Sequence, residues 1–222
     1  MHSFGGDIGA EIAGIDISKP LSALEFAVVK AAFVDRTVLV FRGQKLTGWQ
    51  FADFSAQFGR LRVHIQKAFQ HPEIPEIAYN RNVDADGKFD EVGARRGVTR
   101  DLKYGWHSDT SYESVTAVAT TIHALEVPSS GGNTCFASGY RTYKSLSDAF
   151  KGRLEGLMGE YALGRKNRNS QTQMLTGKLP TGSKNRKTVF HNGKWATTSC
   201  GRIETVSSIR GGWIIPSISA VS

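Results

Sequence analysis

The chain of 222 residues is poor in cysteine and proline, with two of the first and six of the second. Cys135 and Cys200 are too few for a disulfide framework, and they lack the Cys-x-x-Cys spacing of a structural zinc site. The longest apolar run, residues 37–41, is far too short to cross a bilayer, and the first residues lack the features of a secretory signal. We therefore expect a cytoplasmic protein that works without a membrane partner.

Acidic residues are nearly absent from the last quarter of the chain. Residues 165–222 contain ten Lys or Arg and a single acid, Glu204, whereas residues 1–164 contain 18 basic and 19 acidic residues. The net charge of +8 therefore belongs to the C-terminal segment. Clusters such as residues 184–187 could bind phosphates non-specifically. No nucleic-acid-binding fold accompanies them, so nucleic acid is not the expected partner.

Hydrophobic periodicity predicts three helices, each beginning after a residue that can cap it. The capping residues are Ser22, Thr47 and Ser147. The apolar residues at helical spacing are Leu24, Val28, Val29, Ala32 and Phe33 in the first helix, Trp49, Phe51, Phe54 and Phe58 in the second, and Phe150, Leu154 and Leu157 in the third. We expect the apolar side chains of the first two helices to pack in the core.

Runs rich in β-branched residues predict the strands. These are residues 8–17, 37–41, 74–79, 115–127 and 133–137, the last returning after a turn. Helices followed by short strands favour a mainly β or α+β fold, and the length suits one domain with a substantial core. Ligands of such domains usually bind at loops and strand ends.

A histidine and an aspartate two residues apart, His107 and Asp109, precede the predicted strand 115–127. On an extended segment, residues i and i+2 point to the same side, so both side chains could bind one metal ion. A histidine and a carboxylate are two of the three ligands in non-haem iron sites built from two histidines and one carboxylate. His-x-Asp is common in loops, so this interpretation depends on the surrounding sequence.

Five stretches in order resemble the TauD/TfdA family of Fe(II)- and 2-oxoglutarate-dependent dioxygenases. They are residues 9–18, residues 38–47, Phe58-Gly59, residues 106–112 and residues 127–138. The resemblance implies a double-stranded β-helix, or jelly roll, with flanking helices. It also implies Fe(II), 2-oxoglutarate as co-substrate, and O₂. In that chemistry, decarboxylation of 2-oxoglutarate to succinate and CO₂ is coupled to hydroxylation of a substrate C–H bond.

The resemblance assigns roles to individual residues. His107 and Asp109 match two of the metal ligands, and Thr134 matches the threonine that hydrogen-bonds 2-oxoglutarate. His64 matches a position that contacts the acid group of the substrate in relatives, although a half-buried structural histidine is the alternative. Lys103 falls where relatives often carry a substrate-facing asparagine, and a lysine there could pair with an anionic substrate.

The family's distal site is not recognisable in the sequence. There is no Trp-Asp-Asn string, and His191 lies only 84 positions after His107, earlier than the family places its second ligand histidine. Arg202 repeats the family's His-to-Arg gap, which we interpret as a coincidence. We expect residues 1–164 to form the dioxygenase domain. Residues 165–222 are expected to be a basic, atypical segment, truncated or out of frame, that leaves the jelly roll incomplete.

Two functions remain from the sequence. The first is a dioxygenase that hydroxylates a small anionic substrate, such as a sulfonate, an aryloxyalkanoate or another carboxylate. The second is a catalytically impaired relative that lacks the distal His and Arg and binds ligand or metal only weakly. The sequence names neither the substrate nor the oligomeric state, so a homo-oligomer stays open.

Overall fold

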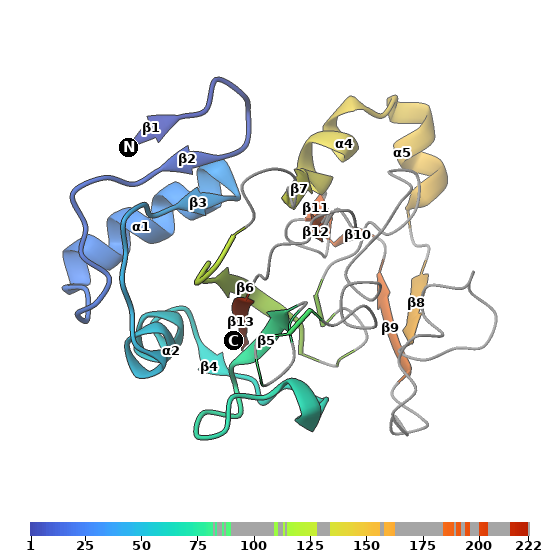
Figure 1. The fold of residues 1–222 in the computed structure, drawn as a ribbon. Coiled ribbons are helices and arrows are strands. Elements are labelled where there is room, and N and C mark those ends of the chain that lie inside the picture. Colours follow the sequence, from blue (N-terminus) through green and yellow to red (C-terminus); the bar gives the residue numbers. More distant parts are fainter. Residues whose placement is uncertain are drawn as a thin grey trace.

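A computed structural model of the chain places its elements around a small central sheet (Figure 1). The structure describes residues 1–81, isolated positions between 83 and 113, residues 115–127 and 134–155, and the backbone of six strands beyond residue 155. Figure 1 shows the N-terminal elements on one side and helices α4 (Gly139–Ser145) and α5 (Asp148–Leu154) on the other. None of the described helices is long and apolar enough to span a bilayer.

A short three-stranded sheet and a long helix form the N-terminal part. Strand β2 (Ala10–Glu11) pairs antiparallel with β1 (His2–Ser3) and parallel with β3 (Leu39–Val40), and α1 (Ala23–Arg36) is the crossover between the two parallel strands. The helix begins where predicted. The Ser22 hydroxyl accepts from the Glu25 N–H and the Glu25 carboxylate accepts from the Ser22 N–H, which makes a capping box.

The buried face of α1 is narrower than predicted. Val29 and Ala32 are buried, at 0% and 8% exposure, whereas Leu24 and Val28 are 77% and 56% exposed. The prediction that Leu24 and Val28 lie in the core is wrong. Periodicity locates an apolar stripe on a helix, but it does not say how much of that stripe the neighbouring elements cover.

Helix α2 (Gly48–Ala56) supplies much of the core beneath the central sheet, and the predicted Thr47 cap is confirmed by a capping box with Gln50. Phe51 and Ala52 form a buried cluster with Ile74 and Ile77. Trp49 is 59% exposed, so the prediction that it packs in the core is wrong. Residues i and i+2 of a helix do not share a face, and Phe51 takes the inner one.

Strand β13 (Ile214–Val221) is the central strand of the main sheet. It pairs antiparallel with β4 (Arg60–Leu61) and β5 (Ala78–Arg81) along one edge and with β6 (Ala117–Ile122) along the other. Of the predicted strand 74–79, only the end lies in β5. Ile74 and Ile77 precede β5 and pack in the core, in a segment that follows the 3₁₀ turn η1 (Lys67–Phe69).

Strand β7 (Thr134–Ala137) lies in a second sheet. It pairs antiparallel with β12 (Cys200–Ile203), so Thr134 lies opposite Ile203 and Cys135 opposite Arg202. The prediction that this strand returns beside the one before it is wrong, because its partner comes from much later in the chain. The remaining strands pair locally, β8 (Met158–Ala162) with β9 (Lys184–Thr188) and β10 (Phe190–His191) with β11 (Lys194–Trp195).

Candidate functional site

Two adjacent threonines of β6 point to opposite faces of the central sheet. The Thr121 hydroxyl lies 2.6 Å from the hydroxyl of Ser55, a fully buried residue of α2. The Thr120 hydroxyl instead donates to Oδ2 of Asp109 at 2.8 Å. Because successive side chains of a strand alternate between faces, α2 covers one face of β6, and Asp109 lies on the other.

The turn after Asp109 is held tightly. Thr110 has a φ of 55°, which is unusual for a β-branched residue, and its side chain is only 5% exposed. The Thr110 hydroxyl accepts from the Ala117 N–H at 2.6 Å, and the Thr110 carbonyl accepts from the Glu113 N–H at 2.8 Å. A residue held in this region costs about 1–3 kcal/mol and persists because its surroundings fix it. The backbone at Thr110, directly after Asp109, is therefore anchored to the start of β6.

An ion pair connects the turn after Asp109 to the residue that follows β4. A guanidinium nitrogen of Arg62 lies 2.5 Å from a carboxylate oxygen of Glu113, and the two side chains are 18% and 31% exposed. A partly buried pair is screened less by solvent than an exposed one. The pair joins the segment after Asp109 to the chain that leads into His64.

His64 is a half-buried residue just after β4. The pKa of its imidazole is lowered from the ordinary value of 6.5, mainly because burial disfavours the charged ring. The positive charge of Arg62 also lowers the pKa, whereas the hydrogen bond with the Gln66 backbone and the negative charge of Asp109 raise it. The ring is therefore mostly neutral near pH 7. Nδ1 lies 3.2 Å from both the carbonyl oxygen and the backbone nitrogen of Gln66, so the neutral ring donates to the carbonyl in one tautomer and accepts from the N–H in the other.

The structure brings together some of the residues singled out in the sequence. Asp109 and His64 are near enough to interact electrostatically. Thr134 is the half-buried first residue of β7, in the other sheet. His107 and Lys103 lie outside the described residues, so their predicted roles stay predictions. Within the described part of the chain, no group of three or more metal-binding side chains is present.

The described part of the site fits a divalent metal ion. Asp109 is an exposed carboxylate whose orientation is fixed by a hydroxyl donor, and carboxylate oxygens suit hard divalent cations. Sequence patterns identified Asp109 but not its support by Thr110, Thr120 and the Arg62–Glu113 pair. Alternation along the predicted strand places Thr120 and Thr121 on different faces. It does not say which of the two faces Asp109 lies on.

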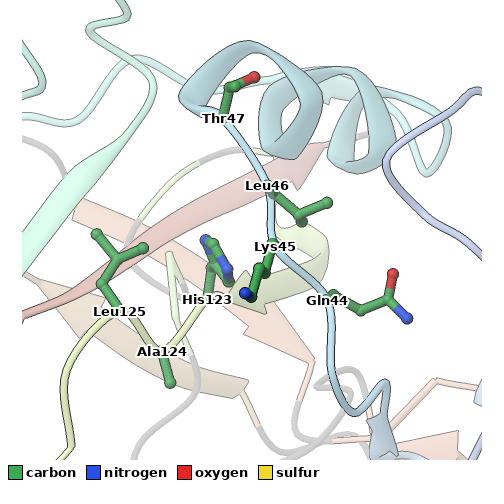
Figure 2. Close-up of a pocket in the computed structure, with 7 residues that line it drawn as sticks. All are labelled: Gln44, Lys45, Leu46, Thr47, His123, Ala124 and Leu125. Carbon is green, nitrogen blue, oxygen red and sulfur yellow. The ribbon is translucent and has the colours of Figure 1, made fainter.

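A hollow of about 390 Å³ lies elsewhere, between residues 44–47 and 123–125. Figure 2 shows the side chains of the two segments that line it, Lys45 and His123 among them. The amide group of Gln44 is bonded to the backbone of Ile15 and Ile17, and the Thr47 hydroxyl caps α2. Neither Asp109 nor Thr134 lines this hollow, so it is separate from the predicted metal site.

Comparisons with known proteins identify the family of the chain. Residues 2–204 match the family described as taurine catabolism dioxygenase TauD, TfdA family. The chain is 35% identical over 158 residues to the alpha-ketoglutarate-dependent 2,4-dichlorophenoxyacetate dioxygenase of Cupriavidus pinatubonensis, which covers 69% of this chain and 55% of that protein. The chain thus spans about half the length of the curated relatives it matches.

Two solved structures share the fold. A taurine dioxygenase from Burkholderia xenovorans has a TM-score of 0.71 at 17% identity, covering 100% of this chain and 88% of that one. AAD-2, in complex with Mn(II) and N-oxalylglycine, has a TM-score of 0.73 at 17% identity, covering 100% of this chain and 96% of that one. The family match across most of the sequence shows that this chain belongs to the TauD/TfdA family of dioxygenases.

Proposed function

We propose that the chain is an Fe(II)- and 2-oxoglutarate-dependent dioxygenase that hydroxylates a small anionic substrate. The observation that carries the proposal is Asp109, which lies in the stretch that resembles the family's metal motif and has its carboxylate oriented by Thr120 of β6. In the reaction, O₂ and 2-oxoglutarate are consumed, one oxygen atom enters succinate beside the released CO₂, and the other becomes the hydroxyl group of the product. The bound iron would supply the activation of O₂.

The residues of the chain have separate parts in this proposal. His107 and Asp109 would hold the metal, and the Thr134 hydroxyl would donate to a carboxylate of 2-oxoglutarate. His64, mostly neutral at pH 7, would donate from its Nε2 to the acid group of the substrate in the tautomer whose Nδ1 accepts the Gln66 N–H. Lys103 would add a positive charge on the same side.

The substrate class follows from the relatives. One of them acts on 2,4-dichlorophenoxyacetate, and a structure with the same fold is a taurine dioxygenase. We propose an aryloxyalkanoate, a sulfonate or another carboxylate for this chain. We also propose that residues 1–164 carry the N-terminal and metal-motif part of a jelly-roll dioxygenase domain, and that residues 165–222 are its basic, atypical segment, whose strands β12 and β13 pair with strands of the first part. We propose that the protein works in the cytoplasm.

The test is succinate release from 2-oxoglutarate with Fe(II), ascorbate and O₂, measured with 2,4-dichlorophenoxyacetate, with taurine and with the uncharged methyl ester of the first. We expect release with an anionic compound and little with the ester. His107→Ala and Asp109→Ala should abolish it, while His2→Ala, which removes an exposed histidine, should leave it unchanged. Chelation should remove activity, and Fe(II) should restore it.

His64→Ala should raise KM for the anionic compound by roughly tenfold or more, because a hydrogen bond to a charged group contributes about 1.5–3 kcal/mol. Its kcat should change less. Either the absence of succinate release with every compound tested, or release that persists unchanged in Asp109→Ala, would contradict the proposed function. An unchanged KM in His64→Ala would contradict only the assignment of His64.

A further inference from the structure

We infer that Thr120 is a positioning residue for the metal-binding carboxylate of Asp109. The inference rests on the proposed function, in which Asp109 binds the metal. Its basis is the 2.8 Å hydrogen bond from the Thr120 hydroxyl to Oδ2 of Asp109, which crosses from the central sheet to the turn that carries the metal motif.

The donor side of this bond is rigid. Thr120 lies inside β6 and pairs with Ser219 of the central strand β13, so its backbone is fixed on the bonded edge of a four-stranded sheet. A β-branched side chain has restricted rotation about χ1. The position of the Thr120 hydroxyl is therefore set by the sheet rather than by the loop that carries Asp109.

The acceptor side is anchored at a second point. Thr110, the residue after Asp109, is buried, and its hydroxyl accepts from the Ala117 N–H, at the first residue of β6. Strand β6 thus holds the turn through the bond from Ala117 to Thr110, and it holds the carboxylate of Asp109 through Thr120. An exposed carboxylate held at both points has less freedom to lose on binding a metal ion, which lowers the ordering cost of binding.

Hydrogen-bonding partners of metal ligands typically affect metal affinity or activity about 10- to 100-fold. Thr120→Val removes the hydroxyl but keeps a β-branched shape that suits a strand. We expect it to weaken the binding of Mn(II) to the metal-free full chain by about 10- to 100-fold. Thr120→Ser keeps a hydroxyl, so its dissociation constant should stay within about threefold of the wild type.

The neighbouring Thr121 provides a matched control. Its hydroxyl contacts Ser55 on the opposite face of the same strand. Thr121→Val should lower the thermal stability of the chain while leaving the affinity for Mn(II) unchanged. Thr120→Val should show the reverse pattern, because its side chain is exposed and takes no part in the α2 core.

The experiment is isothermal titration calorimetry with Mn(II), run on the wild type, the three threonine variants and Asp109→Ala, with circular dichroism melts of each. Weaker binding in Thr120→Val, restored in Thr120→Ser and unaffected in Thr121→Val, supports the inference. Suppose that Asp109→Ala binds Mn(II) weakly, as the proposed function requires. The inference about Thr120 is then overturned if Thr120→Val binds Mn(II) as tightly as the wild type, or if Thr120→Ser loses as much affinity as Thr120→Val. If the wild type binds no Mn(II), or Asp109→Ala binds like the wild type, the proposed function fails as well.

Discussion

Asp109 and Thr110 are consecutive residues in opposite environments: the carboxylate is exposed, and the threonine side chain is buried. The strained φ of Thr110 and its two hydrogen bonds fix the direction in which Asp109 leaves the backbone. The side chain of Asp109 is then held by Thr120 and lies within electrostatic reach of His64. At the scale of single residues, the described site consists of one candidate metal ligand, Asp109, and the contacts that orient its side chain.

Thr110 provides a test of that support. Thr110→Ala removes the acceptor of the Ala117 N–H and leaves a donor unpaired, which should reduce the free energy of unfolding by about 1–3 kcal/mol. Thr110→Ser keeps the acceptor and removes only a buried methyl group, which contributes about 0.8 kcal/mol, so it should lose less stability than Thr110→Ala. Urea denaturation measures both, and equal stability of Thr110→Ala and the wild type would count against this role.

His64 gives a pH-dependent readout. Because burial lowers its pKa, its imidazole should titrate below 6.5 in the metal-free protein, as followed by the NMR shift of its ring proton. The Asp109 charge raises that pKa, so Asp109→Asn should move the midpoint still lower. Asp148→Asn, a change at an exposed helix start, should not move it. A midpoint that rises in Asp109→Asn would contradict the electrostatic link between the two residues.

At the scale of elements, α1 shows how a helix start and a helix face differ in predictability. The start depends on Ser22 and Glu25, which lie three residues apart and meet by local geometry alone. The buried face depends on which other elements cover it. The adjacent residues Val28 and Val29, one 56% exposed and the other fully buried, show the difference within a single turn.

These two valines make a matched pair. Val29→Ala should lower the free energy of unfolding by about 1.5–3 kcal/mol, because it removes a fully buried apolar side chain. Val28→Ala should stay within about 0.5 kcal/mol of the wild type or stabilise slightly, since alanine has the higher helix propensity. Chemical denaturation of the two variants compares them directly, and equal losses would contradict the burial of Val29 alone.

The strands and the site also differ in whether their sequence signals are local or depend on distant elements. Strand β6 could be predicted from its β-branched residues, and Asp109 from its motif, because both signals are local. The pairing of β7 with β12 could not, since the two strands lie far apart in sequence. The role of Thr120 also required knowledge of which face α2 covers. The candidate metal ligand could be proposed from the sequence, while the residues that orient it depend on the assembled sheet.

At the scale of the whole molecule, one strand holds the main sheet together. β13 bonds to β4 and β5 on one edge and to β6 on the other. Pro216, which lacks an N–H, lies opposite Tyr79 of β5 and just before Ser217, where pairing with β6 begins. Proline is therefore placed where the strand has a single bonded neighbour.

Ala220 has bonded neighbours on both sides, opposite Leu61 of β4 and Ala119 of β6. Ala220→Pro removes an N–H from this doubly paired position and should lower the free energy of unfolding by at least about 1–3 kcal/mol. Ala23→Pro, at the first position of α1, where proline is tolerated, is the control and should have little effect. A thermal melt of Ala220→Pro that matches the wild type would argue against β13 as the central strand.

The central place of β13 also has a consequence for biosynthesis. β6 ends at Ile122 and β13 begins at Ile214, so a ribosome completes β4, β5 and β6 well before it makes the strand that joins them. Until then, the nascent chain carries strands with unpaired edges, which are prone to aggregate. The carboxylate that Thr120 holds, and with it the capacity to take up a metal, therefore reaches its final geometry late in the life of the nascent protein.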